Sequence, residues 1–123
     1  MNLSYKQLSL NESIKIIESN NYCHVALSLN NKPYVIPMNY KFIKNNENIY
    51  FIELLSLKYC KKMQIIENNN FVNINIEETF NNSMFSVICY GRVVNINPYN
   101  DYIVKMIIKL DYVSGRIISE NNK

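Results

Sequence analysis

The sequence contains few of the residues on which several common binding sites depend. Its 123 residues include two glycines, three prolines, one histidine and no tryptophan. Phosphate-binding loops of the P-loop and dinucleotide-binding types need several closely spaced glycines, because only glycine lets the backbone approach the phosphate closely. Gly91 and Gly115 lie far apart in the chain. The sequence therefore excludes both types of loop.

The cysteines and the single histidine form no metal or disulfide pattern. Cys23, Cys60 and Cys89 are an odd number, are widely spaced, and include no CxxC pair or Cys/His ligand set. His24 lies in an apolar segment beside Cys23, with no recognisable nucleophile for which it would act as base. The sequence predicts no metal site, and its unpaired cysteines are typical of a reducing compartment, so we expect a cytoplasmic protein.

Long apolar runs and a strong net charge are also missing. No stretch reaches the roughly 18 consecutive apolar residues of a membrane-spanning helix. Residues 1–13 lack the basic cluster and apolar run of a secretory signal. Thirteen Lys and Arg against ten Asp and Glu give a net charge of +3, with the basic residues scattered along the chain. These features argue against a membrane-spanning, secreted or nucleic-acid-binding protein.

The composition indicates one compact domain over residues 1–123. Hydrophobic residues make up 48% of the chain and charged residues 19%, which is typical of a globular protein. A chain of this length buries enough surface to fold without disulfide or metal support.

The N-terminal part of the chain predicts one helix. From Leu8 to Asn21 the apolar residues recur at helical spacing. Ser9 and Glu12 stand three residues apart at the start of this segment, which is the spacing of a capping box. We expect the helix to cover one end of a sheet.

Strands follow, because the hydrophobic period changes to two. Tyr22–Leu29 and Pro33–Phe42 are rich in aromatic and β-branched residues and are separated by Asn30-Asn31-Lys32, which predicts a β-hairpin. A polar turn at 44–48 leads into Ile49–Leu55. The sequence thus predicts three consecutive antiparallel strands.

The middle of the chain predicts a second helix and two more strands. Ser56–Glu67 breaks the alternation and ends at three asparagines, which indicates one short helix. Phe71–Glu77 alternates between apolar and polar residues, and after a polar loop a longer strand runs from Met84 to about Ile96.

The last third of the chain fits two patterns. Asn97-Pro98 could cap a helix. Alternation favours a strand instead, with a turn at Pro98–Asp101. The apolar residues of this alternation are Val104, Met106, Ile108, Leu110 and Tyr112.

Together these segments predict a mainly β protein. It has six short antiparallel strands, a helix at the N-terminus and one short helix between the third and fourth strands. An antiparallel sheet of this kind hides its edges best by closing on itself. We therefore expect a closed or split β-barrel.

One basic cluster could bind a phosphate group. Lys58, Lys61 and Lys62 gather where the second predicted helix begins. Positive side chains and the free amides of a helix N-terminus converge at such a point, and both attract anions. The alternative is an ordinary solvated face, and composition alone leaves both interpretations open.

Four segments carry a family resemblance. They are KPYVIPMNY at Lys32–Tyr40, KKMQIIENN at Lys61–Asn69, SVICYGR at Ser86–Arg92 and VSGR at Val113–Arg116. Their order and spacing resemble the FMN-binding split barrels of the pyridoxamine 5'-phosphate oxidase superfamily, and especially its nitroimidazole-resistance-like flavoprotein branch.

The resemblance implies a homodimer with FMN in each of two grooves between the subunits. The flavin would lie along the Val35–Tyr40 strand, and the basic segment would hold its phosphate. Apolar walls and a few fixed hydrogen-bonding groups suit such a ring system. The cofactor-binding residues that the resemblance implies are Val35, Pro37, Met38, Asn39, Tyr40, Glu53, Ser56, Lys61, Lys62 and Ser86.

The function that follows is that of a small FMN-binding oxidoreductase acting on a small-molecule electron donor or acceptor. The residues identify no catalytic acid or base. Two alternatives stay open: a flavin-binding module without activity, and a haem-binding split barrel with His24 or Tyr90 as ligand.

Overall fold

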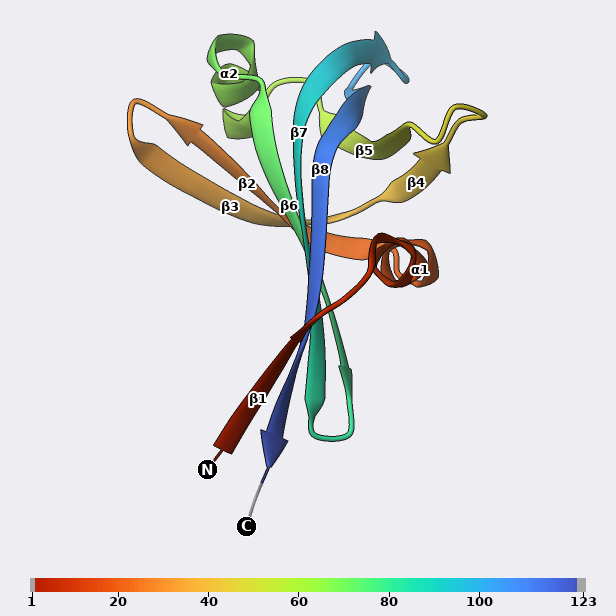
Figure 1. The fold of residues 1–123 in the computed structure, drawn as a ribbon. Helices are drawn as coiled ribbons and strands as arrows, with labels where there is room; N and C mark the ends of the chain where they lie inside the picture. The colour runs from red at the N-terminus through yellow and green to blue at the C-terminus, as the bar shows by residue number, and fades with distance from the viewer. Residues whose placement is uncertain (1, 122–123) are drawn as a thin grey trace.

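The computed structural model describes residues 2–121 as an antiparallel sheet with two helices (Figure 1). The mainly β class and the two helices agree with the sequence. The elements in chain order are β1 (Asn2–Gln7), α1 (Leu10–Ser19), β2 (Tyr22–Leu29), β3 (Lys32–Asn39), β4 (Lys41–Lys44), β5 (Tyr50–Leu57), α2 (Lys61–Asn68), β6 (Phe71–Phe80), β7 (Ser83–Pro98) and β8 (Ile103–Asn121).

Helix α1 forms where the sequence predicts it, because its N-terminus is capped locally. Ser9 Oγ accepts a hydrogen bond from the Glu12 backbone N–H at 3.1 Å, and Glu12 Oε1 accepts one from the Ser9 N–H at 2.9 Å. The helix packs against β8 at Gly115, where an added Cβ would collide with Ser13 Oγ and approach Leu8. A side chain at Gly115 would therefore force the Ser13 side chain to shift at the contact between α1 and β8.

The β2–β3 hairpin is also confirmed. Leu29 pairs with Lys32 across a two-residue turn, in which Asn30 and Asn31 have φ of 52° and 61°. Two consecutive residues with positive φ give the turn whose twist matches a β-hairpin, and asparagine tolerates this conformation better than most residues.

The predicted strand Pro33–Phe42 breaks at Tyr40, which the sequence did not indicate. Tyr40 is buried and its hydroxyl donates a 2.6 Å hydrogen bond to the Ile17 carbonyl, while its N–H donates to Asn21 O at 2.9 Å. These bonds draw the chain out of β3 towards α1. The residues after Tyr40 form β4, which pairs with β5 instead of β2.

The sheet order is therefore β3-β2-β6-β7-β8-β5-β4, with β1 added beside the end of β8. Two expectations are wrong. The described residues form eight strands instead of six, because β1 was missed and β4 is separate from β3. The third predicted strand, now β5, pairs antiparallel across the predicted turn, but with β4, and its other neighbour is β8, so it does not lie beside β3 in the hydrogen-bonded sheet.

The last strand resolves the ambiguity of the C-terminal segment. β8 is a strand along its whole length and pairs with β7, and a register shift between Tyr90 and Gly91 leaves Asp111 as an extra residue. Leu110 is buried before this bulge and Tyr112 is exposed after it. The bulge explains why Tyr112, which continues the apolar alternation, turns to the opposite face.

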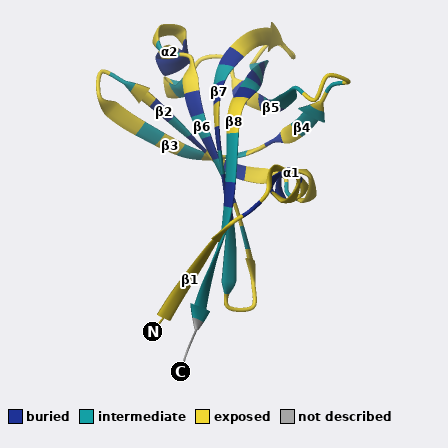
Figure 2. Ribbon diagram, in the orientation of Figure 1, coloured by how far each residue is buried: buried dark blue, intermediate teal, exposed yellow. Residues whose placement is uncertain are grey.

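The core lies on the inner side of the curved sheet, where the buried segments of the strands face the inner sides of α1 and α2 (Figure 2). Its most enclosed members have no exposed surface: Ile17, Ile52, Ile74, Ile76, Val87, Cys89 and Ile108. Within residues 2–121, neither helix has the length and apolar character needed to cross a membrane.

Candidate functional site

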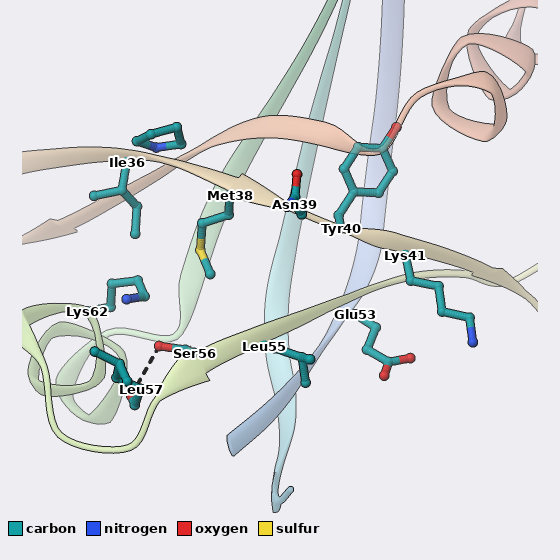
Figure 3. A pocket seen from close by; sticks show the side chains of 11 residues that line it. Ile36, Met38, Asn39, Tyr40, Lys41, Glu53, Leu55, Ser56, Leu57 and Lys62 are labelled. Atoms are coloured by element: carbon teal, nitrogen blue, oxygen red, sulfur yellow. Dashed lines mark hydrogen bonds between the residues drawn. The ribbon is translucent and has the colours of Figure 1, made fainter. Parts of the chain in front are cut away.

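A groove of about 750 Å³ lies where the sheet is left open. β3 and β5 run past each other without pairing, because the chain leaves β3 at Tyr40 to reach the far side of β5. Side chains and backbone of both strands line the gap, and the start of α2 closes one end (Figure 3). The lining residues are Ile36, Pro37, Met38, Asn39, Tyr40, Lys41, Glu53, Leu55, Ser56, Leu57 and Lys62.

Apolar side chains form the long walls of the groove. Ile36 and Met38 come from β3, and Leu55 and Leu57 from the more exposed side of β5. Leu55 is 45% exposed and Leu57 60% exposed, although both are large and apolar. Walls of this kind suit a flat ligand with an apolar surface, and the volume lies within the range of small-molecule sites.

One end of the groove is suited to an anion. Lys62 lies in the first turn of α2 and lines the groove beside Ser56. Ser56 is buried, and its hydroxyl donates to the Leu57 carbonyl at 3.1 Å, which fixes the side chain. The first amides of α2 have no partner within the helix, and they and the ammonium group favour a negative ligand here.

Cys60 contacts two residues at this end of the groove, Ser56 and Lys62, although it lines the neighbouring depression and not the groove itself. It is the N-cap residue of α2, and its Sγ accepts a hydrogen bond from Lys62 Nζ at 3.4 Å. Partial burial raises the pKa of the Cys60 thiol, but the neighbouring Met63 backbone N–H, the Ser56 hydroxyl and the Lys62 ammonium outweigh it, so the pKa lies below its usual value. At a given pH, a larger fraction of Cys60 is therefore in the thiolate form than of an ordinary cysteine.

The opposite end of the groove carries an ion pair. Glu53 Oε1 accepts from Lys105 Nζ at 3.0 Å. Lys41 is the cross-strand neighbour of Glu53 on β4 and also lines the groove. The groove thus has charged groups at both ends and apolar walls between them.

The structure brings most of the predicted site residues together. Three of them lie outside the groove: Val35, Lys61 and Ser86. Val35 is exposed next to the wall residue Ile36, and Lys61 lines a separate depression with Lys58. Ser86 is buried in β7 and accepts a hydrogen bond from Asn75. Those in the groove are Pro37, Met38, Asn39, Tyr40, Glu53, Ser56 and Lys62.

Sequence reasoning missed several groove residues. Lys41 was placed in a continuous strand, and Leu57 in the predicted second helix. Leu55 carried no signal of its own, since an apolar residue in a strand is expected in the core. Lys105 reaches Glu53 from β8, 52 positions further along the chain, and only the strand register shows that contact.

The two residues considered as haem ligands lie elsewhere. His24 is exposed on β2, with its ring centroid 5.6 Å from that of Tyr22. Tyr90 is 51% exposed on β7 beside Tyr112. Neither lines the groove between β3 and β5. Within residues 2–121, no three His, Cys, Asp or Glu side chains gather as metal ligands would.

The sequence matches one family. Residues 9–116 match the family model described as "Pyridoxamine 5'-phosphate oxidase". No curated protein matches the chain significantly.

Several solved structures share the fold at low sequence identity. A FAD-binding protein of Mesorhizobium loti superimposes with a TM-score of 0.83 at 21% identity, over 97% of this chain and 100% of that one. A candidate 5-nitroimidazole antibiotic resistance protein of Bacteroides thetaiotaomicron gives 0.78 at 17% identity, over 96% and 90%. A FAD-binding protein of Mycobacterium smegmatis gives 0.72 at 18% identity, over 93% and 98%.

Proposed function

The chain belongs to the pyridoxamine 5'-phosphate oxidase family, and from that premise we propose that it is a homodimeric, FMN-dependent oxidoreductase that binds its flavin in the groove between β3 and β5. The observation that carries the proposal is the groove itself, with apolar walls and an anion-binding end in one continuous cavity. The structural relatives named as FAD-binding proteins support a flavin as the ligand.

The residues of the groove fit the parts of FMN. Lys62, the Ser56 hydroxyl and the first amides of α2 would hold the phosphate. Met38, Leu55 and Leu57 would contact the faces of the ring. β3 is an edge strand whose outer edge has no strand partner among the described residues, so its backbone at Pro37–Asn39 offers hydrogen-bonding groups to the polar edge of the ring.

When bound, the flavin supplies the electron transfer. The chain binds and orients it, and the apolar walls exclude water from its faces. Among the groove residues the carboxylate is Glu53, which is paired with Lys105, so we assign no acid or base. Because no acid or base is assigned among the groove residues, the second candidate function is a flavin carrier without turnover.

FMN is preferred to FAD because the groove has one anion-binding end. Lys62 and the start of α2 together suit a single phosphate group. At the opposite end no helix begins among the lining residues, and the Glu53 carboxylate engages the Lys105 ammonium group.

A second subunit is supported by the exposed aromatic residues on one face of the sheet. The cross-strand pairs Val35–Ala26, Ala26–Asn73, Asn73–Tyr90 and Tyr90–Tyr112 place these residues on one side. Val35, Tyr90 and Tyr112 are each more than half exposed, at 57%, 51% and 57%. Exposed apolar patches of this kind commonly mark interfaces between protein chains.

The experiment is an absorbance spectrum of the purified protein, followed by chromatography of the released cofactor. We expect flavin bands and FMN on release. A colourless protein that does not bind added FMN would contradict the proposal, and a Soret band would support the haem alternative. Oxidation of a reduced nicotinamide with an added electron acceptor then separates an enzyme from a carrier.

A further inference from the structure

An ion pair lies at the end of the groove away from α2, and so away from the proposed phosphate position. Lys105 Nζ lies 3.0 Å from Glu53 Oε1, and the Glu53 side chain is 14% exposed against 36% for Lys105. Glu53 lines the groove, whereas Lys105 approaches it from β8. The carboxylate therefore lies between the cation and any ligand in the groove.

The strand register shows why Lys105 is the cation that makes this contact. Lys105 pairs with Leu55, two residues after Glu53 on the groove side of β5. Lys41 pairs with Glu53 and Lys109 pairs with Phe51. In the part of the chain that the structure describes, neither Lys41 nor Lys109 lies within salt-bridge distance of Glu53, whereas Lys105 does.

A second contact also restrains Lys105. Its ammonium group lies 5.9 Å from the centroid of the Tyr99 ring. This is within the distance at which an aromatic face attracts a cation. The position of the ammonium group is thus restrained by the ring and by the carboxylate together.

The Glu53 carboxylate lies where the ring of a bound flavin is expected. Glu53 and Ser56 are three residues apart on β5, which corresponds to roughly 10 Å along an extended strand. A flavin whose phosphate binds beside Ser56 and Lys62 would extend along β5 towards Glu53. A bare carboxylate beside the ring would oppose the negative charge that the ring gains on reduction.

We propose that Lys105 is a positioning residue that raises the redox potential of the bound flavin by neutralising and orienting Glu53. This inference rests on the proposed function. In the reduction, the oxidised flavin takes two electrons from the reductant and one proton from solvent, so the ring becomes more negative by one charge. Neutralisation of Glu53 favours the reduced flavin. Lys105 would therefore shift the reduction equilibrium and not the folding equilibrium.

The test is the two-electron potential of the flavin-loaded protein, measured at equilibrium with a reference dye while xanthine and xanthine oxidase supply the electrons. Lys105→Met should lower the reduction equilibrium constant about tenfold, which is about 30 mV for a two-electron couple. Lys105→Arg should keep the potential close to that of the wild type, because the positive charge is retained. Glu53→Gln should raise it, and Glu53→Gln combined with Lys105→Met should lie close to wild type. Lys15→Met on the exposed face of α1 is the control.

Each outcome decides the inference. An unchanged potential in flavin-loaded Lys105→Met would overturn it, and so would an equal fall in Lys105→Met and in the double variant, because Lys105 would then act without Glu53. If Lys105→Met does not fold or load, the potential of Glu53→Gln decides alone, and an unchanged value overturns the inference. Failure of the wild-type protein to bind flavin contradicts the proposed function instead.

Discussion

Lys62 Nζ donates a 3.4 Å hydrogen bond to Cys60 Sγ, so a cation and a thiol are held together where α2 begins. Lys61 is the neighbouring residue, yet its side chain lines not the groove but the depression that Lys58, Cys60 and Glu67 also line. Two adjacent lysines that look equivalent in the sequence are therefore placed differently in the structure, which makes them a matched pair for testing the anion-binding end of the groove.

We predict that Lys62→Ala weakens FMN binding while Lys61→Ala leaves it nearly unchanged. A hydrogen bond to a charged group contributes about 1.5 to 3 kcal/mol, which corresponds to roughly 10- to 150-fold in the dissociation constant. The Lys62→Ala variant should lose this amount of binding free energy, because Lys62 lines the groove. Fluorescence titration of the flavin-free protein measures both constants, and equal losses in the two variants would refute the assignment.

We predict that Cys60 is the first cysteine to be alkylated. Burial raises the pKa of both Cys23 and Cys89 to about 12, whereas the pKa of Cys60 lies below its usual value. The thiolate is the reacting form, so Cys60 should react with iodoacetamide at neutral pH while the other two stay protected. Mass spectrometry of the peptides identifies the site. Bound FMN should slow the reaction, because Cys60 lies beside the proposed phosphate position.

The local features of the fold could be predicted because neighbouring residues determine them. The capping box of Ser9 and Glu12 determines where α1 begins, and Asn30-Asn31 supplies the turn of the β2–β3 hairpin. The break at Tyr40 could not be predicted, because it depends on a hydrogen bond to Ile17, 23 residues away. The groove exists because of that break, so its full lining could not be read from the strand pattern.

Two other parts of the molecule gave no local signal. β1 is exposed along its length and forms because the end of β8 extends far enough to pair with it. Lys105 meets Glu53 only through the pairing of β8 with β5. Lys62 belongs to a basic cluster that the sequence shows at a predicted helix start, but the sequence left open whether this cluster binds an anion and did not separate Lys62 from Lys58 and Lys61.

We predict that the protein loses stability as the pH rises above about 9. Because burial raises the pKa of the Cys23 and Cys89 thiols to about 12, they stay protonated in the folded state when the unfolded chain has already released the protons. A thiol whose pKa is higher in the folded state contributes its full stabilisation below the pKa of the unfolded chain. This stabilisation is lost as the pH rises towards 12. The free energy of unfolding should fall by about 1.4 kcal/mol per pH unit for each thiol. Urea titrations with reductant at several pH values measure this slope, and Cys89→Ala should reduce it.

We predict that Tyr112→Glu converts a dimer into a monomer, whereas Tyr59→Glu does not. Tyr112 is paired with Tyr90 on the aromatic face of the sheet, with ring centroids 6.1 Å apart. A two-fold axis would bring both copies of a new carboxylate into one interface, where burial and like charge oppose association. Tyr59 is 86% exposed before α2 and off this face, so it controls for the added charge. Light scattering after gel filtration gives the mass of each variant. A monomeric wild-type protein, or a Tyr112→Glu variant that stays dimeric, would contradict the aromatic face as the interface.

If the second subunit completes the groove, the monomeric variant should also lose FMN, because Leu55 and Leu57 would stay as exposed as they are in a single chain.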